Sequence, residues 1–181
     1  MKTPQKIWPY AAIILAAIGT VGSLYLSIGL GLKACPLCFY QRTFMMSVLA
    51  VLTLGLLVDR SQESFLCLLS LPLAVAGLIV AAFHEYLVIS EKLECPAGMF
   101  GLGTAPFQSL AWFIVLTISV ALGIGARLGP AIGGIVLGSA LAAGCVTSAP
   151  PMPSLPAKPY DQPLEICRPP FRPSDKYGEQ K

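Results

Sequence analysis

The chain has 181 residues, of which 55% are hydrophobic and only 12% are charged, and its formal net charge is +3. With a mean hydropathy of +0.73, this composition excludes an ordinary soluble domain and indicates an integral membrane protein. The small net charge also gives no reason to expect a nucleic-acid partner.

The apolar residues fall in five long blocks. A bilayer core about 30 Å thick needs roughly 20 apolar residues per helix, and lipid offers the backbone no hydrogen-bond partners, so helices are expected. The blocks are 8–32, 36–58, 65–89, 107–126 and 129–146. We therefore predict an all-α fold. A transmembrane four-helix bundle covers 1–128, an extra transmembrane helix covers 129–149, and an extended, poorly packed, proline-rich tail covers 150–181.

Basic residues in the short flanking segments predict the orientation, because cytoplasmic flanks carry an excess of lysine and arginine. The residues concerned are Lys2, Lys6, Arg60 and Arg127. Segments 33–41 and 91–106 then lie on the outer, oxidising face.

The fifth block decides where the tail lies, and it has two interpretations. It is rich in Gly, Ala and Ser, so its insertion is less secure than that of the leucine-rich blocks. Its end, "LGSALAAGC", is similar to a lipoprotein signal ending at Cys145, whose processing would lipidate that cysteine. Such signals normally begin a chain, which favours an ordinary small-residue helix. With either interpretation Cys167 lies outside. If the fifth block does not cross the membrane, Cys167 is cytoplasmic.

The stretch "CPLC" places two cysteines at the mouth of the second helix. Pro36 suits a first helical turn, so Cys35 takes the cap and Cys38 the first turn. There the helix dipole and Arg42, one turn further on, favour a thiolate. The pattern also fits half a zinc site or a structural bridge. Zinc is disfavoured because there is no second C-x-x-C and the only histidine, His84, ends a membrane helix. The short loop disfavours a structural bridge.

The stretch "CPLCFYQR" at the start of a second membrane helix resembles the signature of the DsbB family. These bacterial inner-membrane proteins pass electrons from the periplasmic dithiol oxidant DsbA to quinone. The resemblance covers about residues 8–126 and includes "ECPAGMFGLGTAPFQSL", in which a cysteine precedes a Gly-Leu step, a proline and a glutamine. Phe107 separates that proline from Gln108, which departs from the family pattern. The vitamin K epoxide reductase family differs, since its C-x-x-C lies at the last core helix.

The resemblance implies roles for individual residues. Cys35 and Cys38 would exchange electrons with ubiquinone or menaquinone, with Cys38 nearer the ring and Arg42 supporting both quinone and thiolate. His84 matches a histidine near the quinone, although a packing role is equally compatible with the sequence. The implied partners are a DsbA-like periplasmic thioredoxin-fold protein, the membrane quinone pool and the bilayer. The implied location is the inner membrane, multi-pass, with the active cysteines on the periplasmic face.

The second outer loop departs from the family because it holds one cysteine, Cys95, where the family has two. The fifth block and the tail are additional to the family's four helices. From this departure we predict that Cys167 replaces the missing cysteine and pairs with Cys95. The alternative is a non-enzymatic transporter or metal-handling protein with structural or ligand cysteines. A transporter is disfavoured because the mid-helix positions are almost uniformly apolar.

Three further expectations concern single positions. Glu85 is expected to mark the water interface, and Cys67 is expected to pack as a small hydrophobic residue. Three glycines in the segment 91–106 are expected to make that loop flexible.

Overall fold

The computed structural model describes residues 7–151, 156 and 158–171. These residues form five long helices and no strand, and all five helices are long and apolar enough to cross a membrane. The helices are α1 (Ile7–Ile28), α2 (Pro36–Val58), α3 (Glu63–Ile89), α4 (Ala105–Ile124) and α5 (Leu128–Ser148). The predicted all-helical membrane fold is confirmed. Lys2 and Lys6, used for the orientation, lie outside the described residues.

The helix bounds follow the apolar blocks closely, and the differences have local causes. α2 has the predicted bounds because Cys35 caps it and Pro36 begins it. α1 ends four residues early, where the chain turns at Gly31 with a φ of +69°. α4 begins two residues early because the Thr104 side chain accepts a hydrogen bond from the Phe107 N–H, an N-cap that the hydropathy pattern does not show.

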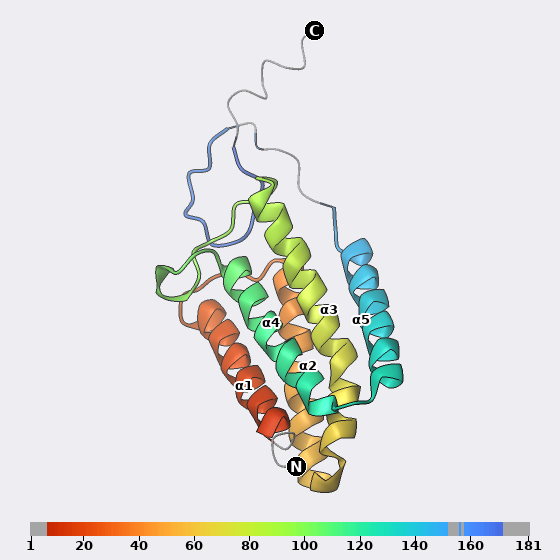
Figure 1. Cartoon of the computed structure of the whole chain (residues 1–181). Helices are drawn as coiled ribbons and strands as arrows, with labels where there is room; N and C mark the ends of the chain where they lie inside the picture. Colours follow the sequence, from red (N-terminus) through yellow and green to blue (C-terminus); the bar gives the residue numbers. More distant parts are fainter. Residues whose placement is uncertain (1–6, 152–155, 157, 172–181) are drawn as a thin grey trace.

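α3 is the central helix of the bundle (Figure 1), packing against α2, α4 and α5, while α1 packs against α2 and α4. Small residues allow the close approaches. Gly77 faces the Phe113 ring, and a Cβ at Gly138 would lie 2.6 Å from a backbone oxygen of α3. Cys67 is fully buried, as expected for a small hydrophobic residue. Because α5 packs mainly against α3, it lies outside the core formed by the other four helices.

The described tail, residues 158–171, returns over the end of the bundle at which α2 begins (Figure 1), and Cys167 within it is bonded to Cys95. Glu94 and Arg168 form an antiparallel bridge, with N···O distances of 2.8 and 3.0 Å, and the Lys33 N–H donates to the Glu165 carbonyl at 2.8 Å. This described part of the tail is extended, and its contacts dock it on the bundle rather than leaving it poorly packed.

The loop between α3 and α4 is a closed turn held by Gln108. The Gln108 amide accepts from the Met99 N–H and donates to the carbonyls of Met99 and Leu102, each at 2.8 Å. Gly101 and Gly103 adopt positive φ values of 68° and 72° within this turn. These two glycines thus serve the turn geometry, a use that the expectation of a flexible loop did not include.

Candidate functional site

Two thiols lie at the mouth of α2. Cys35 is the N-cap, its sulfur accepting from the Cys38 N–H at 3.3 Å, and the two sulfur atoms are 3.0 Å apart. Both cysteines carry free thiols, with Cys35 buried and Cys38 half-buried. The proline after the cap fixes this geometry because it begins the helix without losing a hydrogen bond.

A disulfide joins Cys95, in the loop after α3, to Cys167 in the tail. The antiparallel bridge between Glu94 and Arg168 places the two cysteines side by side in neighbouring chain segments. Cys95 is buried, whereas Cys167 is half-buried and is the more accessible of the two. The structure therefore contains one dithiol and one disulfide at the same end of the bundle.

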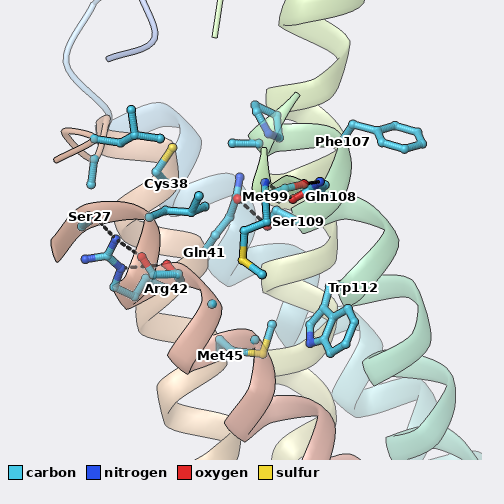
Figure 2. A pocket seen from close by; sticks show the side chains of 18 of the residues that line it. Ser27, Cys38, Gln41, Arg42, Met45, Met99, Phe107, Gln108, Ser109 and Trp112 are labelled. Atoms are coloured by element: carbon cyan, nitrogen blue, oxygen red, sulfur yellow. Dashed lines mark hydrogen bonds between the residues drawn. The ribbon is translucent and has the colours of Figure 1, made fainter. Parts of the chain in front are cut away.

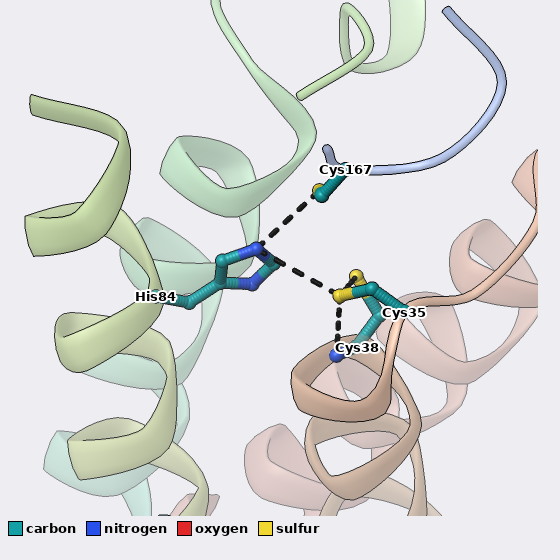
Figure 3. Close-up of side chains that lie close together, drawn as sticks. All are labelled: Cys35, Cys38, His84 and Cys167. Carbon is teal, nitrogen blue, oxygen red and sulfur yellow. Dashed lines mark hydrogen bonds between the residues drawn. The ribbon is translucent and has the colours of Figure 1, made fainter. Parts of the chain in front are cut away.

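His84 of α3 lies between Cys167 on one side and Cys35 and Cys38 on the other (Figure 3), and Cys95, the disulfide partner of Cys167, also contacts its ring. Its ring is fully buried. The Nε2 atom is 3.4 Å from the sulfur atoms of Cys95 and Cys167 and 3.8 Å from that of Cys35. One imidazole nitrogen therefore contacts both pairs, which is a more specific position than a packing histidine requires.

The thiolate of Cys35 is the favoured form in this environment. The hydrogen bond from the Cys38 thiol is the main cause, and the hydrogen bond with His84 adds to it. Together they outweigh the opposing effect of burial and lower the pKa of Cys35 to about 4. At neutral pH Cys35 is thus a thiolate within reach of His84.

Two polar residues that the sequence analysis did not single out complete this network. Gln41, which is buried on α2, places its amide nitrogen 3.2 Å from His84 Nδ1. Ser109 of α4 donates its hydroxyl to the Gln41 amide oxygen at 2.7 Å. The only sequence signal was a polar residue inside an otherwise apolar helix, and its partners are 43 and 68 residues away.

A cavity of about 440 Å³ opens beside the cysteines, between α1, α2, α4 and the loop (Figure 2). Its walls are mostly apolar. They include Cys38, Arg42, Met45, Met99, Phe107 and Trp112. An apolar cavity of this size with a few polar groups is typical of a small-molecule site.

Arg42 lies on the wall of this cavity and is held there by α1. Its guanidinium donates to the Ser23 hydroxyl at 2.9 Å, to the Ser23 carbonyl at 3.0 Å and to the Ser27 hydroxyl at 2.5 Å. The sequence predicted a counter-ion beside the two cysteines, and these hydrogen bonds add that the guanidinium is held by α1. The hydrogen bonds to α1 therefore fix the guanidinium on the cavity wall.

Two other predicted features of this end differ in detail. Glu85 is buried, 8% exposed, with the Thr104 hydroxyl 3.4 Å from its carboxylate, so it does not mark a water interface. The possible ligand atoms of Cys35, Cys38, His84 and Cys167 lie within 4.8 Å of one another. They could hold a metal only after the disulfide is reduced, because a disulfide sulfur is not a thiolate ligand.

Cys145 is a separate free thiol near the end of α5.

Comparison with known proteins gives one consistent answer. Residues 5–114 match the family model described as "Disulfide bond formation protein DsbB". The chain is 30% identical over 122 residues to "Probable disulfide formation protein" of Chlamydia muridarum, covering 61% of this chain and 88% of that protein. It is 28% identical over 146 residues to "Disulfide bond formation protein B" of Cupriavidus necator, covering 64% and 90% respectively. No solved structure matches. The chain is thus a multi-pass membrane protein that belongs to the DsbB family of disulfide bond formation proteins.

Proposed function

We propose that this member of the family oxidises a DsbA-like periplasmic thioredoxin-fold protein and passes the electrons to membrane quinone through two cysteine pairs. Membership of the family supports a disulfide oxidoreductase. The observation that carries the finer proposal is the position of Cys38, which lies 3.0 Å from Cys35 within the sulfur cluster and also lines the apolar cavity.

The Cys95–Cys167 disulfide would receive electrons from the soluble partner. A partner thiolate attacks the more accessible sulfur, that of Cys167, forming a mixed disulfide and releasing Cys95 as a thiolate. The second partner thiolate then attacks its neighbour's sulfur, which releases the oxidised partner and the Cys167 thiolate. Two electrons thereby enter the outer pair, and the partner gains one disulfide.

The inner pair, Cys35 and Cys38, would take these electrons when it is oxidised. The Cys95 thiolate attacks Cys35 and expels the Cys38 thiolate. The Cys167 thiolate then attacks Cys95, which restores the outer disulfide and releases the Cys35 thiolate. The short distances around His84 support this exchange, since Cys35, Cys95 and Cys167 all approach one ring nitrogen. The described structure corresponds to the product, with a reduced inner pair and an oxidised outer pair.

The cavity beside Cys38 fits a quinone in its volume, apolar walls and single guanidinium. A quinone, ubiquinone or menaquinone, accepts two electrons and two protons, which regenerates the inner disulfide. Cys38 would be the thiol that faces it, and Arg42, bound to Ser23 and Ser27, would orient it and stabilise negative charge there. The apolar walls of Met45 and Trp112 would exclude water from this face.

The placement of basic residues supports a periplasmic face for the cysteines. Arg60 and Arg127 lie in the connections α2–α3 and α4–α5, at the end of the bundle opposite to Cys35. The positive-inside rule puts that end in the cytoplasm. The cysteine end then meets the oxidising compartment, where its disulfide chemistry is needed.

The test is quinone reduction by purified protein with a reduced DsbA-like protein as electron donor. Cys38→Ser should abolish quinone reduction, and Arg42→Ala should lower it while leaving residual activity. Cys67→Ser is the matched control, because this buried cysteine lies in α3 outside the sulfur cluster. Full activity of Cys38→Ser, or equal loss in Cys67→Ser, would contradict the proposal.

A further inference from the structure

Gln41 is a buried polar residue that makes two side-chain hydrogen bonds to other helices. The Ser109 hydroxyl donates to its amide oxygen at 2.7 Å, so its amide nitrogen faces His84 Nδ1 at 3.2 Å. An amide nitrogen donates and cannot accept, so Nδ1 must be the acceptor. A neutral imidazole then carries its proton on Nε2.

The protonated nitrogen is the one that faces the sulfur atoms. Nε2 lies 3.4 Å from the sulfurs of Cys95 and Cys167 and 3.8 Å from that of Cys35. In the exchange proposed above, negative charge appears on each of these three sulfurs in turn. A single N–H at this point can donate to whichever of them is the thiolate, without rotation of the ring.

The geometry points to Gln41 as a positioning residue that fixes the tautomer of His84, so that Nε2–H is the shared hydrogen-bond donor for the thiolates of both cysteine pairs. Gln41 hydrogen-bonds to His84 and Ser109 and to no cysteine sulfur among the described residues, so it acts on the thiolates through His84, although its side chain also lines the cavity beside Cys38. The inference rests on the proposed function for its role in exchange, but the tautomer itself does not.

The other ionisable groups near His84 have partners other than its Nδ1 atom, so the tautomer of His84 depends on Gln41. Cys38 faces the Cys35 sulfur at 3.0 Å, and Cys95 and Cys167 are joined as a disulfide. The Arg42 guanidinium is directed to the serines of α1. In the part of the chain that the structure describes, Gln41 is the group that contacts Nδ1.

The chain contains a single histidine, so the tautomer can be read without assignment. Protein labelled with ¹⁵N-histidine and purified through a tag without histidine gives imidazole signals from His84 alone. We expect a proton-bearing Nε2 and an unprotonated Nδ1 in the state with reduced inner and oxidised outer pairs. A proton-bearing Nδ1 with an unprotonated Nε2 in this unmodified chain would overturn the inference. The measurement needs neither quinone nor partner, so it stands even if the proposed function fails.

Two variants test whether Gln41 fixes the tautomer of His84 or only packs in the core. Gln41→Leu removes the donor, so the preference for a proton on Nε2 should be lost. The midpoint of Cys35 alkylation against pH should rise by about one unit, which is a tenfold fall in the thiolate-to-thiol ratio at a given pH. Gln41→Glu keeps the size of the side chain but accepts rather than donates, so Nδ1 should become protonated. Ser119→Ala is the control, because this buried α4 serine bonds only its own helix, at the Val115 carbonyl. Unchanged imidazole signals in both Gln41 variants would refute the role.

Discussion

Removal of the Arg168 side chain should make the outer disulfide easier to reduce. This arginine contacts Glu94 at 2.6 Å, lies over the Tyr160 ring at 3.8 Å and donates to the Gln162 carbonyl at 3.1 Å. It neighbours Cys167 in sequence, and its backbone pairs with the neighbour of Cys95. These contacts hold the tail in the position in which the two sulfurs are bonded, so they stabilise the oxidised state.

The size of the effect follows from the interactions that Arg168→Ala removes. A partly exposed ion pair is worth about 0.2–1 kcal/mol, and the stacking of a guanidinium on an exposed ring about 0.5–1 kcal/mol. The docked tail is therefore less stable in the variant by roughly 1–2 kcal/mol. The oxidised state, in which the tail is docked, bears most of this destabilisation, so the reduction potential should rise. About 1.4 kcal/mol corresponds to roughly 30 mV for two electrons, which gives a rise of about 20–40 mV.

The assay is equilibration of purified protein with a thiol redox buffer, followed by mass-spectrometric counting of alkylated Cys95 and Cys167. Lys33→Ala is the control. Its ion pair with Glu165, at 3.1 Å, has side chains that are 70% and 46% exposed, so it should contribute little. A potential that is unchanged in Arg168→Ala, or that rises equally in Lys33→Ala, would refute the idea that these contacts set the outer potential.

The site and the fold support three other predictions. The rate of Cys35 alkylation should stay constant as the pH is lowered from about 9, and then fall with a midpoint near a pKa of about 4. The Cys35 thiolate is lost only when the pH falls through the pKa of the folded protein. A midpoint near that of an ordinary thiol would contradict this. The double variant Ser23→Ala with Ser27→Ala should raise the KM for quinone by roughly three- to tenfold by releasing the guanidinium on the cavity wall, and an unchanged KM would argue against that role. Gly138→Val should cost about 1–3 kcal/mol of stability on thermal unfolding in detergent, whereas Gly133→Val, which meets open space, should not.

Much of the fold was predictable because its causes are local. Apolar length sets the five helices, since each must satisfy its own backbone within lipid. The mouth of α2 was also predictable, because a capping Cys35 and a proline at the first position are neighbours in sequence. The start of α4 was harder to predict from the sequence, because its N-cap, Thr104, lies outside the apolar block.

The site was only partly predictable because its hydrogen bonds are long-range. The resemblance implied that Arg42 supports the quinone and the thiolate, but its partners on α1 are 15 and 19 residues away and carry no pattern. Glu85 illustrates the opposite error. A charged residue near a helix end is usually placed at the interface, yet here Glu85 is buried, with the Thr104 hydroxyl beside its carboxylate. Both cases depend on which helices become neighbours, which apolar periodicity does not specify.

The fifth helix has a simple topological consequence for the second cysteine of the outer pair. After four spans the chain lies at the end of the bundle opposite to Cys35, so a residue beyond α4 can reach Cys95 only after one more span. α5 supplies that span, and the sequence separation of 72 between Cys95 and Cys167 is a small entropic obstacle, since each doubling of a loop costs only about 0.6 kcal/mol. The tail contacts of Glu94 with Arg168 can offset a cost of that size. A cysteine carried on a separate, docked segment can therefore replace one within the loop, provided that the helix and the docking residues accompany it.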